Sequence, residues 1–133
     1  FAPIGSPETP FTGTLDGQGF GVTDLYINRP DENSAGLFGY VSAGGTVTNC
    51  YATGAVTGSS YVGGLVGVNS GTVTASYYDT QTTGQADNTG KGAPRTTAAM
   101  YQQATFTGWD FGVVWTIIED TDYPRLEWES AGT

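Results

Sequence analysis

The sequence predicts an all-β protein, a short parallel β-solenoid (β-helix) of about three to four coils with a small aromatic C-terminal cap containing one short helix. Gly and Thr contribute 21 residues each to the 133 of the chain, and both are weak helix formers, whereas Thr, Tyr and Val favour strands. Short segments also recur along the chain, with no helical segment between them, which argues against a βαβ fold.

Two sequence elements carry this repetition. Residues 22–26 (VTDLY) align with 47–51 (VTNCY), and these align with 73–77 (VTASY); GLFG at 36–39 recurs as GLVG at 64–67. Strands this short cannot bury an apolar face alone, but stacking successive repeats in register builds a continuous core. An antiparallel sandwich with coincidental similarity is the alternative interpretation.

The expected organisation is one domain with three parts. These are solenoid coils at 1–79 with repeats near 22–51 and 47–77, a surface loop at 80–95, and a C-terminal cap at 96–133. Each repeat is expected to hold two short strands, at 61–68 and 72–78 in the second repeat. A helix is expected at 96–103, with Thr96 as its N-cap, and the aromatic tail is expected to close the open solenoid end.

Two repeated residue types suggest specific roles. Glycines such as Gly63 and Gly64 are expected at corners, where the chain needs positive φ or close backbone approach. Tyr51 and Tyr77 occupy one repeat position and are expected to form a ladder along the solenoid.

Charge and composition exclude several functions. The formal charge is −9, with 13 acidic and 4 basic residues, so we expect no nucleic-acid binding. The absence of His removes imidazole catalysis and the commonest metal ligand, and a single Cys excludes an intrachain disulfide and Cys-rich metal sites. No apolar run approaches the roughly 20 residues of a membrane-spanning helix, so no membrane insertion is expected.

The chain resembles the GLUG-motif repeat modules of bacterial and archaeal secreted and surface proteins. The matching segments are FTGTLDGQG (11–19), LYINRP (25–30), GLFGYV (36–41), NCYATGAV (49–56) and YVGGLVGVNSGTV (61–73), followed by a typical closing segment with TTAAM (96–100), GWDF (108–111) and YPRL (123–126). The resemblance implies a right-handed β-solenoid in exported, often adhesin-like proteins, without established catalytic residues.

Carboxylates are the first candidates for chemistry. Calcium is the metal that abundant oxygen ligands would favour, and its candidate ligands are Asp79, Asp87 and Asn88, although their spacing matches neither an EF-hand nor a calcium-binding nonapeptide. The remaining acidic candidates form no repeated inward cluster and are expected in turns or in solvent: Asp16, Asp24, Glu119, Asp120 and Asp122. No catalytic residue and no cofactor is therefore expected.

Aromatic residues of the tail are the second set of candidates. Trp109, Trp115, Tyr123 and Trp128 either form a sugar-stacking platform or are buried in the cap. Cys50 is expected to pack as a small residue, with an intermolecular disulfide as the alternative.

Taken together, the sequence predicts a non-enzymatic structural or adhesive module, located extracellularly or at the cell surface. The expected partner is a second copy, stacked head to tail into a fibre, or a host or cell-surface glycan or protein. A carbohydrate-binding module that uses the exposed tail aromatics is the alternative.

Overall fold

The computed structural model describes residues 2–17, 25–86 and 91–130, and their secondary structure is mostly β. The strands are β1 (Thr14–Asp16), β2 (Ile27–Ala35), β3 (Phe38–Val41), β4 (Thr46–Thr48), β5 (Tyr51–Ala52), β6 (Val56–Val62), β7 (Val66–Asn69), β8 (Thr72–Thr74), β9 (Tyr77–Asp79), β10 (Ala93–Arg95), β11 (Trp115–Thr116) and β12 (Arg125–Leu126). The helices are short: α1 (Thr80–Thr83), α2 (Thr97–Met100), the 3-10 helix η1 (Gln103–Thr105) and α3 (Glu127–Ser130).

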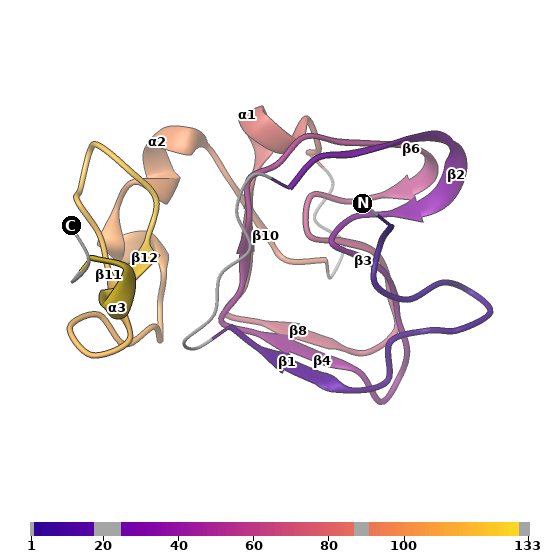
Figure 1. Cartoon of the computed structure of the whole chain (residues 1–133), viewed down its shortest axis with the longest axis horizontal. Helices are drawn as coiled ribbons and strands as arrows, with labels where there is room; N and C mark the ends of the chain where they lie inside the picture. Colours follow the sequence, from indigo (N-terminus) through magenta and orange to yellow (C-terminus); the bar gives the residue numbers. More distant parts are fainter. Residues whose placement is uncertain (1, 18–24, 87–90, 131–133) are drawn as a thin grey trace.

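Parallel pairing joins equivalent strands of successive repeats. Four sheets are parallel, with strand orders β1-β4-β8, β10-β9-β5, β2-β6 and β3-β7. In Figure 1 the four parallel sheets surround one interior, and the strands of each sheet lie behind one another. The expected β class and the parallel pairing of repeats are therefore confirmed.

The register confirms two of the predicted alignments. Thr46 pairs with Thr72 and Tyr51 with Tyr77, at an offset of 26 residues. Phe38 pairs with Val66, 28 residues further on. Phe38 and Val47 thus lie against the apolar residues Val66 and Val73 of the next repeat.

The first repeat is aligned differently from the prediction. Thr14–Asp16 pairs with Thr46–Thr48. The predicted alignment began at residue 22, and residues 18–24 lie outside the described part of the chain. Tyr26 immediately precedes β2 and is 62% exposed. The physical reason is the Thr-Leu-Asp pattern of β1, which places Leu15 against the buried Val47.

Corners divide each predicted strand into two. β6 ends at Val62 and β7 begins at Val66, and β8 and β9 are separated in the same way. Asn49 and Ala75, equivalent in adjacent repeats, both have positive φ, at 51° and 44°. Ser34 and Tyr61 form a second such pair, at 62° and 55°. The left-handed conformation bends the chain at these four positions, none of which is the expected glycine.

The corner glycines instead permit close approach. A Cβ on Gly63 would lie 1.9 Å from the carbonyl oxygen of Val66, and one on Gly64 would lie 2.4 Å from the Tyr78 ring. Among the described residues, the positive-φ glycines are at other positions.

The core lies between the sheets. Its main cluster combines Phe38, Val47, Val66 and Tyr78 from three of the parallel sheets with Leu65 from the corner before β7. A smaller cluster under β2 and β6 contains Ile27, Ala35 and Val56, and the half-buried Leu25 contacts both clusters. No helix in the described ranges has the length and apolarity to cross a bilayer.

The predicted loop at 80–95 contains two ordered elements. The helix α1 begins directly after Asp79, whose carboxylate caps it, and ends at Gly84 with a φ of 72°. β10 adds a strand to β9, with Ala93 opposite Tyr77. The predicted helix at 96–103 is shorter, ending at Met100, and its predicted N-cap Thr96 is confirmed.

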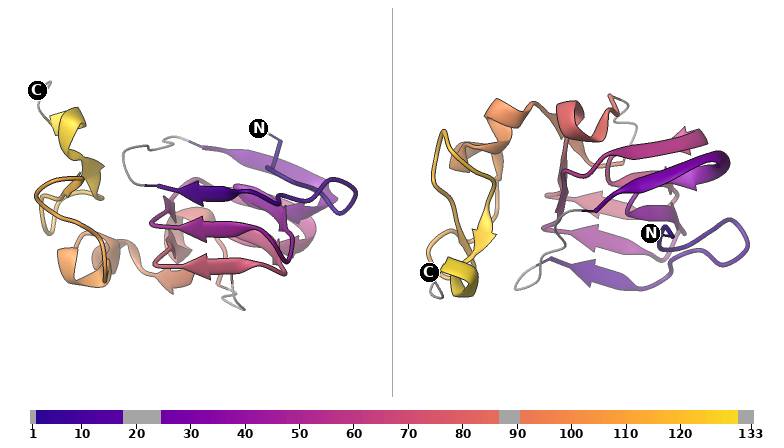
Figure 2. Two further views of the ribbon diagram at one scale, coloured as in Figure 1. Left: turned by 90° about the horizontal axis from the view of Figure 1, so that it is seen from below. Right: turned by 45° about the horizontal axis from the view of Figure 1, so that its top comes forward.

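The C-terminal segment lies beside the parallel sheets and does not close their end. Figures 1 and 2 show α2, β11, β12 and α3 next to the side formed by β5, β9 and β10. Its aromatic cluster packs on Tyr51 and Tyr77, which project from neighbouring strands of that side. The expected end cap is thus corrected to a lateral unit, because this tyrosine column offers apolar surface on the flank.

Leu65 and Leu15 should contribute very differently to the stability of the protein. Leu65 is fully buried, whereas Leu15 is 36% exposed. Leu65→Ala should lower the free energy of unfolding in urea by about 2–5 kcal/mol, because it leaves a cavity in close-packed surroundings. Leu15→Ala is the matched control and should cost clearly less; equal losses would contradict this arrangement.

Candidate functional site

The tyrosine column organises the lateral unit. The Tyr51 hydroxyl donates to the Pro124 carbonyl at 2.6 Å, and the Trp109 indole N–H donates to the Ala75 carbonyl at 2.7 Å. The Tyr77 ring lies 5.1 Å from Phe106, edge to face. Apolar contact and hydrogen bonds thus fix the C-terminal segment to two successive repeats.

Asp79 is a structural carboxylate. It is fully buried; one oxygen accepts hydrogen bonds from the backbone N–H groups of Gln81 and Thr82, at 2.8 and 3.1 Å, and the other accepts from the Tyr123 hydroxyl at 2.7 Å. These bonds cap α1 and link it to the lateral unit.

Of the three predicted calcium ligands, the structure describes Asp79. Asp79 is occupied by the three hydrogen bonds above, and Asp87 and Asn88 lie outside the described residues. Within residues 2–17, 25–86 and 91–130, no group of three or more His, Cys, Asp or Glu is placed to hold a metal.

The tail aromatics divide between the two alternatives, a sugar-stacking platform and burial. Trp109 and Trp115 are buried within the lateral unit, with ring centroids 4.3 Å apart. Tyr123 is partly buried and bonded to Asp79. Trp128 is 64% exposed. The four rings therefore do not present one exposed surface, because the tyrosine column covers two of them.

The other acidic residues have local partners. Asp16 accepts from the Asn49 amide at 3.2 Å, Asp120 accepts from the Gln102 amide at 2.6 Å, and Asp122 pairs with Arg125. Glu119 accepts from the backbone N–H of Gln103 at 3.0 Å, and Asp24 lies outside the described residues.

Cys50 is buried, and its thiol donates to the Thr48 carbonyl at 3.0 Å. Burial raises the pKa of this thiol to about 11, which lowers its thiolate fraction at neutral pH. The packing role predicted for Cys50 therefore fits its surroundings.

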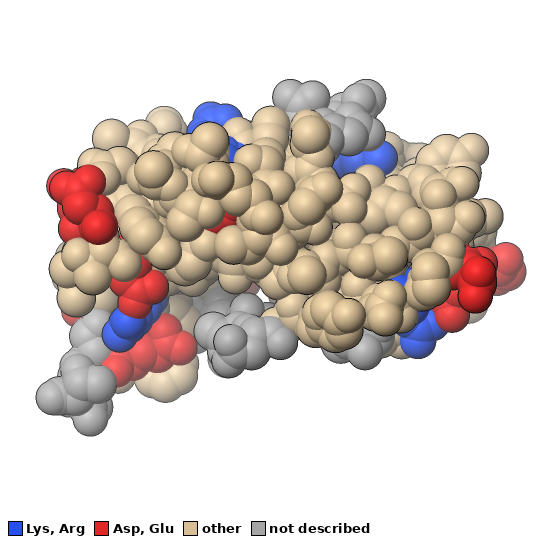
Figure 3. Space-filling model, turned by 90° about the horizontal axis from the view of Figure 1, so that it is seen from above, with Lys and Arg blue, Asp and Glu red and all other residues tan. Residues whose placement is uncertain are grey.

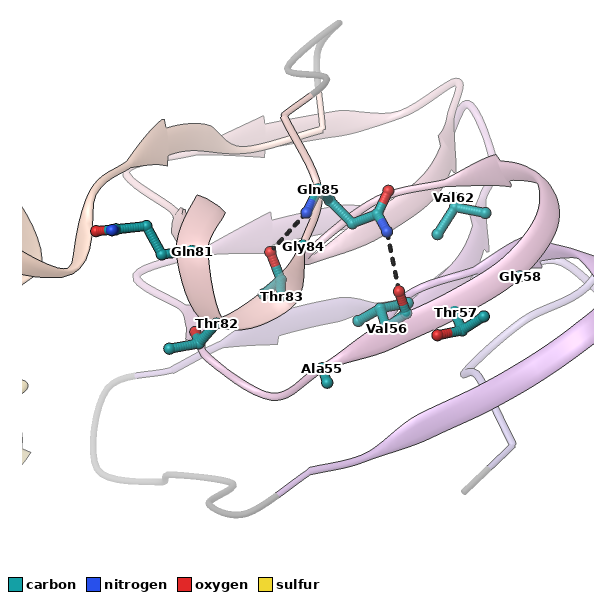
Figure 4. A pocket seen from close by; sticks show the side chains of 10 residues that line it. All are labelled: Ala55, Val56, Thr57, Gly58, Val62, Gln81, Thr82, Thr83, Gly84 and Gln85. Carbon is teal, nitrogen blue, oxygen red and sulfur yellow. Dashed lines mark hydrogen bonds between the residues drawn. The ribbon is translucent and has the colours of Figure 1, made fainter.

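An open groove lies between β6 and α1 (Figure 4). Its volume is about 460 Å³, and its lining is uncharged: Ala55, Val56, Thr57, Gly58, Val62, Gln81, Thr82, Thr83, Gly84 and Gln85. Figure 3 shows the face that carries α1 and β6: uncharged side chains cover most of its middle, and acidic side chains gather toward its two ends. The groove therefore suits an uncharged ligand.

Sequence reasoning missed this groove. One wall is the segment after Asp79, which was predicted as loop. The signal for α1 was present, since Asp79 is followed by Thr80–Thr83 and then by Gly84, a typical N-cap and C-terminal glycine pair.

Comparison with known proteins identifies two long relatives. The chain is 49% identical over 115 residues to a Gly-rich membrane protein of Evansella cellulosilytica, a match covering 80% of this chain and 13% of that protein. It is 44% identical over 68 residues to halomucin of Haloquadratum walsbyi, covering 50% and 1% respectively. No family model matches the chain, and no solved structure matches it. Both names are compatible with the expected extracellular or surface location.

The two bonded tyrosines predict an alkaline loss of stability. Burial, with nearby carboxylates, raises the pKa of Tyr51, and burial with the Asp79 hydrogen bond raises that of Tyr123. Because the folded state favours the protonated phenols, this stabilisation is complete below the ordinary tyrosine pKa of about 10 and is lost as the pH rises above it.

Urea unfolding between pH 8 and pH 11 measures this effect. The double variant Tyr51→Phe/Tyr123→Phe should be less stable at pH 8 and should lose less stability than the unsubstituted protein as the pH rises. Parallel pH profiles for the two proteins would contradict the prediction.

Proposed function

We propose that this chain is a short parallel β-solenoid, right-handed and built from GLUG-type repeats, that serves as a non-enzymatic structural or adhesive module. Its proposed location is extracellular or at the cell surface. The observation that carries the proposal is the in-register pairing of β1, β4 and β8, which come from three successive turns of the chain.

The length of the relatives supports a modular role. The chain spans about 13% and 1% of the two relatives that it matches, and stacked repeats suit long proteins because each repeat contacts only its neighbours. Their names, a membrane protein and a halomucin, favour a surface setting for this chain as well. A non-enzymatic role is supported by carboxylates that serve as cap, turn and ion-pair partners.

Head-to-tail assembly is part of this proposal. β1 and β8 are the two edges of one sheet, and strand edges accept further strands. Leu15 belongs to the same inward column as Val47 but is 36% exposed. β8 of one copy on β1 of the next would cover Leu15 and continue the register from Val73.

β10 sets a geometric condition on this contact. It extends its sheet one strand beyond β9, so β10 lies beside the position that β1 of an incoming copy would take on β8. Repetition of such a contact, which does not close on itself, would generate a fibre.

Carbohydrate binding is the second candidate function. Its supporting observation is Trp128, which is 64% exposed on the lateral unit. Aromatic rings expose apolar faces on which a sugar ring would stack. A glycan array with Trp128→Ala as the comparison variant tests this, and an array without hits would rule the candidate out.

Sedimentation velocity over a wide concentration range, with electron microscopy, tests assembly. The unsubstituted protein should associate and form filaments. The carbonyl of Gly13 faces β4, and successive strand residues point their backbone groups to opposite sides, so the N–H of Thr14 points to the free edge. Thr14→Pro removes this N–H and should suppress association. Thr14→Val keeps that N–H and should assemble normally. A monodisperse monomer at the highest concentration would contradict the proposal.

A further inference from the structure

The groove between β6 and α1 lies where the repeat pattern would place another strand. In one repeat, β5 is followed by β6; in the next, the equivalent β9 is followed by α1. The sheets that contain β4 and β5 each have three strands, whereas among the described residues β6 pairs with β2 alone. The chain has therefore left a strand position beside β6 that α1 only partly covers.

The backbone of β6 offers hydrogen-bonding groups to this position. Ala55 accepts from the Ile27 N–H and Gly63 donates to the Ala35 carbonyl, so both face β2. Because successive strand residues direct these groups to opposite sides, Val56, Gly58 and Val62 direct theirs into the groove. All three line it.

The side-chain amide of Gln85 already donates a hydrogen bond to one of these backbone groups. The Gln85 Nε2 donates to the Val56 carbonyl at 2.9 Å, and Figure 4 shows this side chain reaching from the segment after α1 to β6. A carboxamide N–H is chemically close to a peptide N–H. Gln85 therefore makes the bond that the backbone of a neighbouring strand would make.

We propose that this groove binds an extended, uncharged polypeptide segment, which adds to β6 as a parallel strand. An added strand would hydrogen-bond to the backbone groups of Val56, Gly58 and Val62. A main-chain N–H of the peptide would take the place of the Gln85 amide on the Val56 carbonyl. An uncharged segment is selected because no lining residue carries a charge to pair with one, and burying an unpaired charge is costly.

Other features of the groove favour a strand over a sugar. None of the ten lining residues is aromatic, so a pyranose would lack a stacking surface. Val56 and Gly58 face the groove at the two-residue spacing of a strand, which matches a peptide backbone. The inference is independent of head-to-tail assembly, which uses the edges of β1 and β8.

Amide NMR of the ¹⁵N-labelled protein tests the proposal with a defined probe. The probe is an acetylated and amidated peptide with the sequence of residues 53–63, TGAVTGSSYVG, which is uncharged and repeats β6. It should shift the amide signals of Val56, Gly58 and Val62 and slow their hydrogen exchange. The same peptide N-methylated at alternate residues cannot pair along one edge and should have no effect.

Three variants sharpen the result. Gln85→Ala should bind the peptide roughly three- to tenfold more tightly, because one competing hydrogen bond is removed. Thr57→Arg, an exposed lining position, should abolish binding, whereas Ser59→Arg, also exposed on β6 but outside the lining, should not. Both arginine variants are surface changes, and their amide spectra report whether they fold.

Several results would overturn the proposal. These are no shift with millimolar peptide, equal binding of the N-methylated peptide, or equal loss of binding in both arginine variants. Shifts of the same amides by cellohexaose in place of the peptide would also overturn it, because they would assign the groove to a saccharide.

Discussion

The parallel register between repeats is the constraint on which the rest of the structure depends. Pairing Thr46 with Thr72 also pairs Tyr51 with Tyr77, because both pairs share one 26-residue offset. A slip of one residue would turn every side chain to the opposite face. It would remove Val47 from the core and the tyrosine column from the flank, and the lateral unit would lose its docking surface.

The lateral unit shows how one repeated position acquires a second role. Tyr51 and Tyr77 point away from the interior that Val47 and Leu65 fill, yet they are largely covered because the C-terminal aromatics pack on them. Asp79 strengthens this link by joining α1 to Tyr123 through a buried carboxylate. Because the segment covers a flank, both edges of the sheet formed by β1, β4 and β8 remain edges.

Much of the repeat arrangement was predictable, and the reasons for the exceptions are physical. The alignments at offsets of 26 and 28 residues were predicted from Val-Thr and Gly-Leu patterns. The first repeat was misaligned because VTDLY resembles VTNCY more closely than LDGQG (15–19) does, although Leu15 fits the column of Val47 better. The lateral docking could not be predicted, since an aromatic-rich tail suits an end or a flank equally, and the groove depends on α1, which is only four residues long.

NOE spectroscopy of the isotope-labelled protein measures this register and its docking surface most directly. The structure predicts cross-peaks between Val47 and Val73 and between Tyr51 and Tyr77, together with contacts of the Tyr51 ring with Trp109, whose ring centroid lies 6.0 Å away. Antiparallel cross-strand contacts between the repeats, or Trp109 contacts with the edge strand β8 in place of Tyr51, would contradict the parallel register and the lateral position of the C-terminal segment.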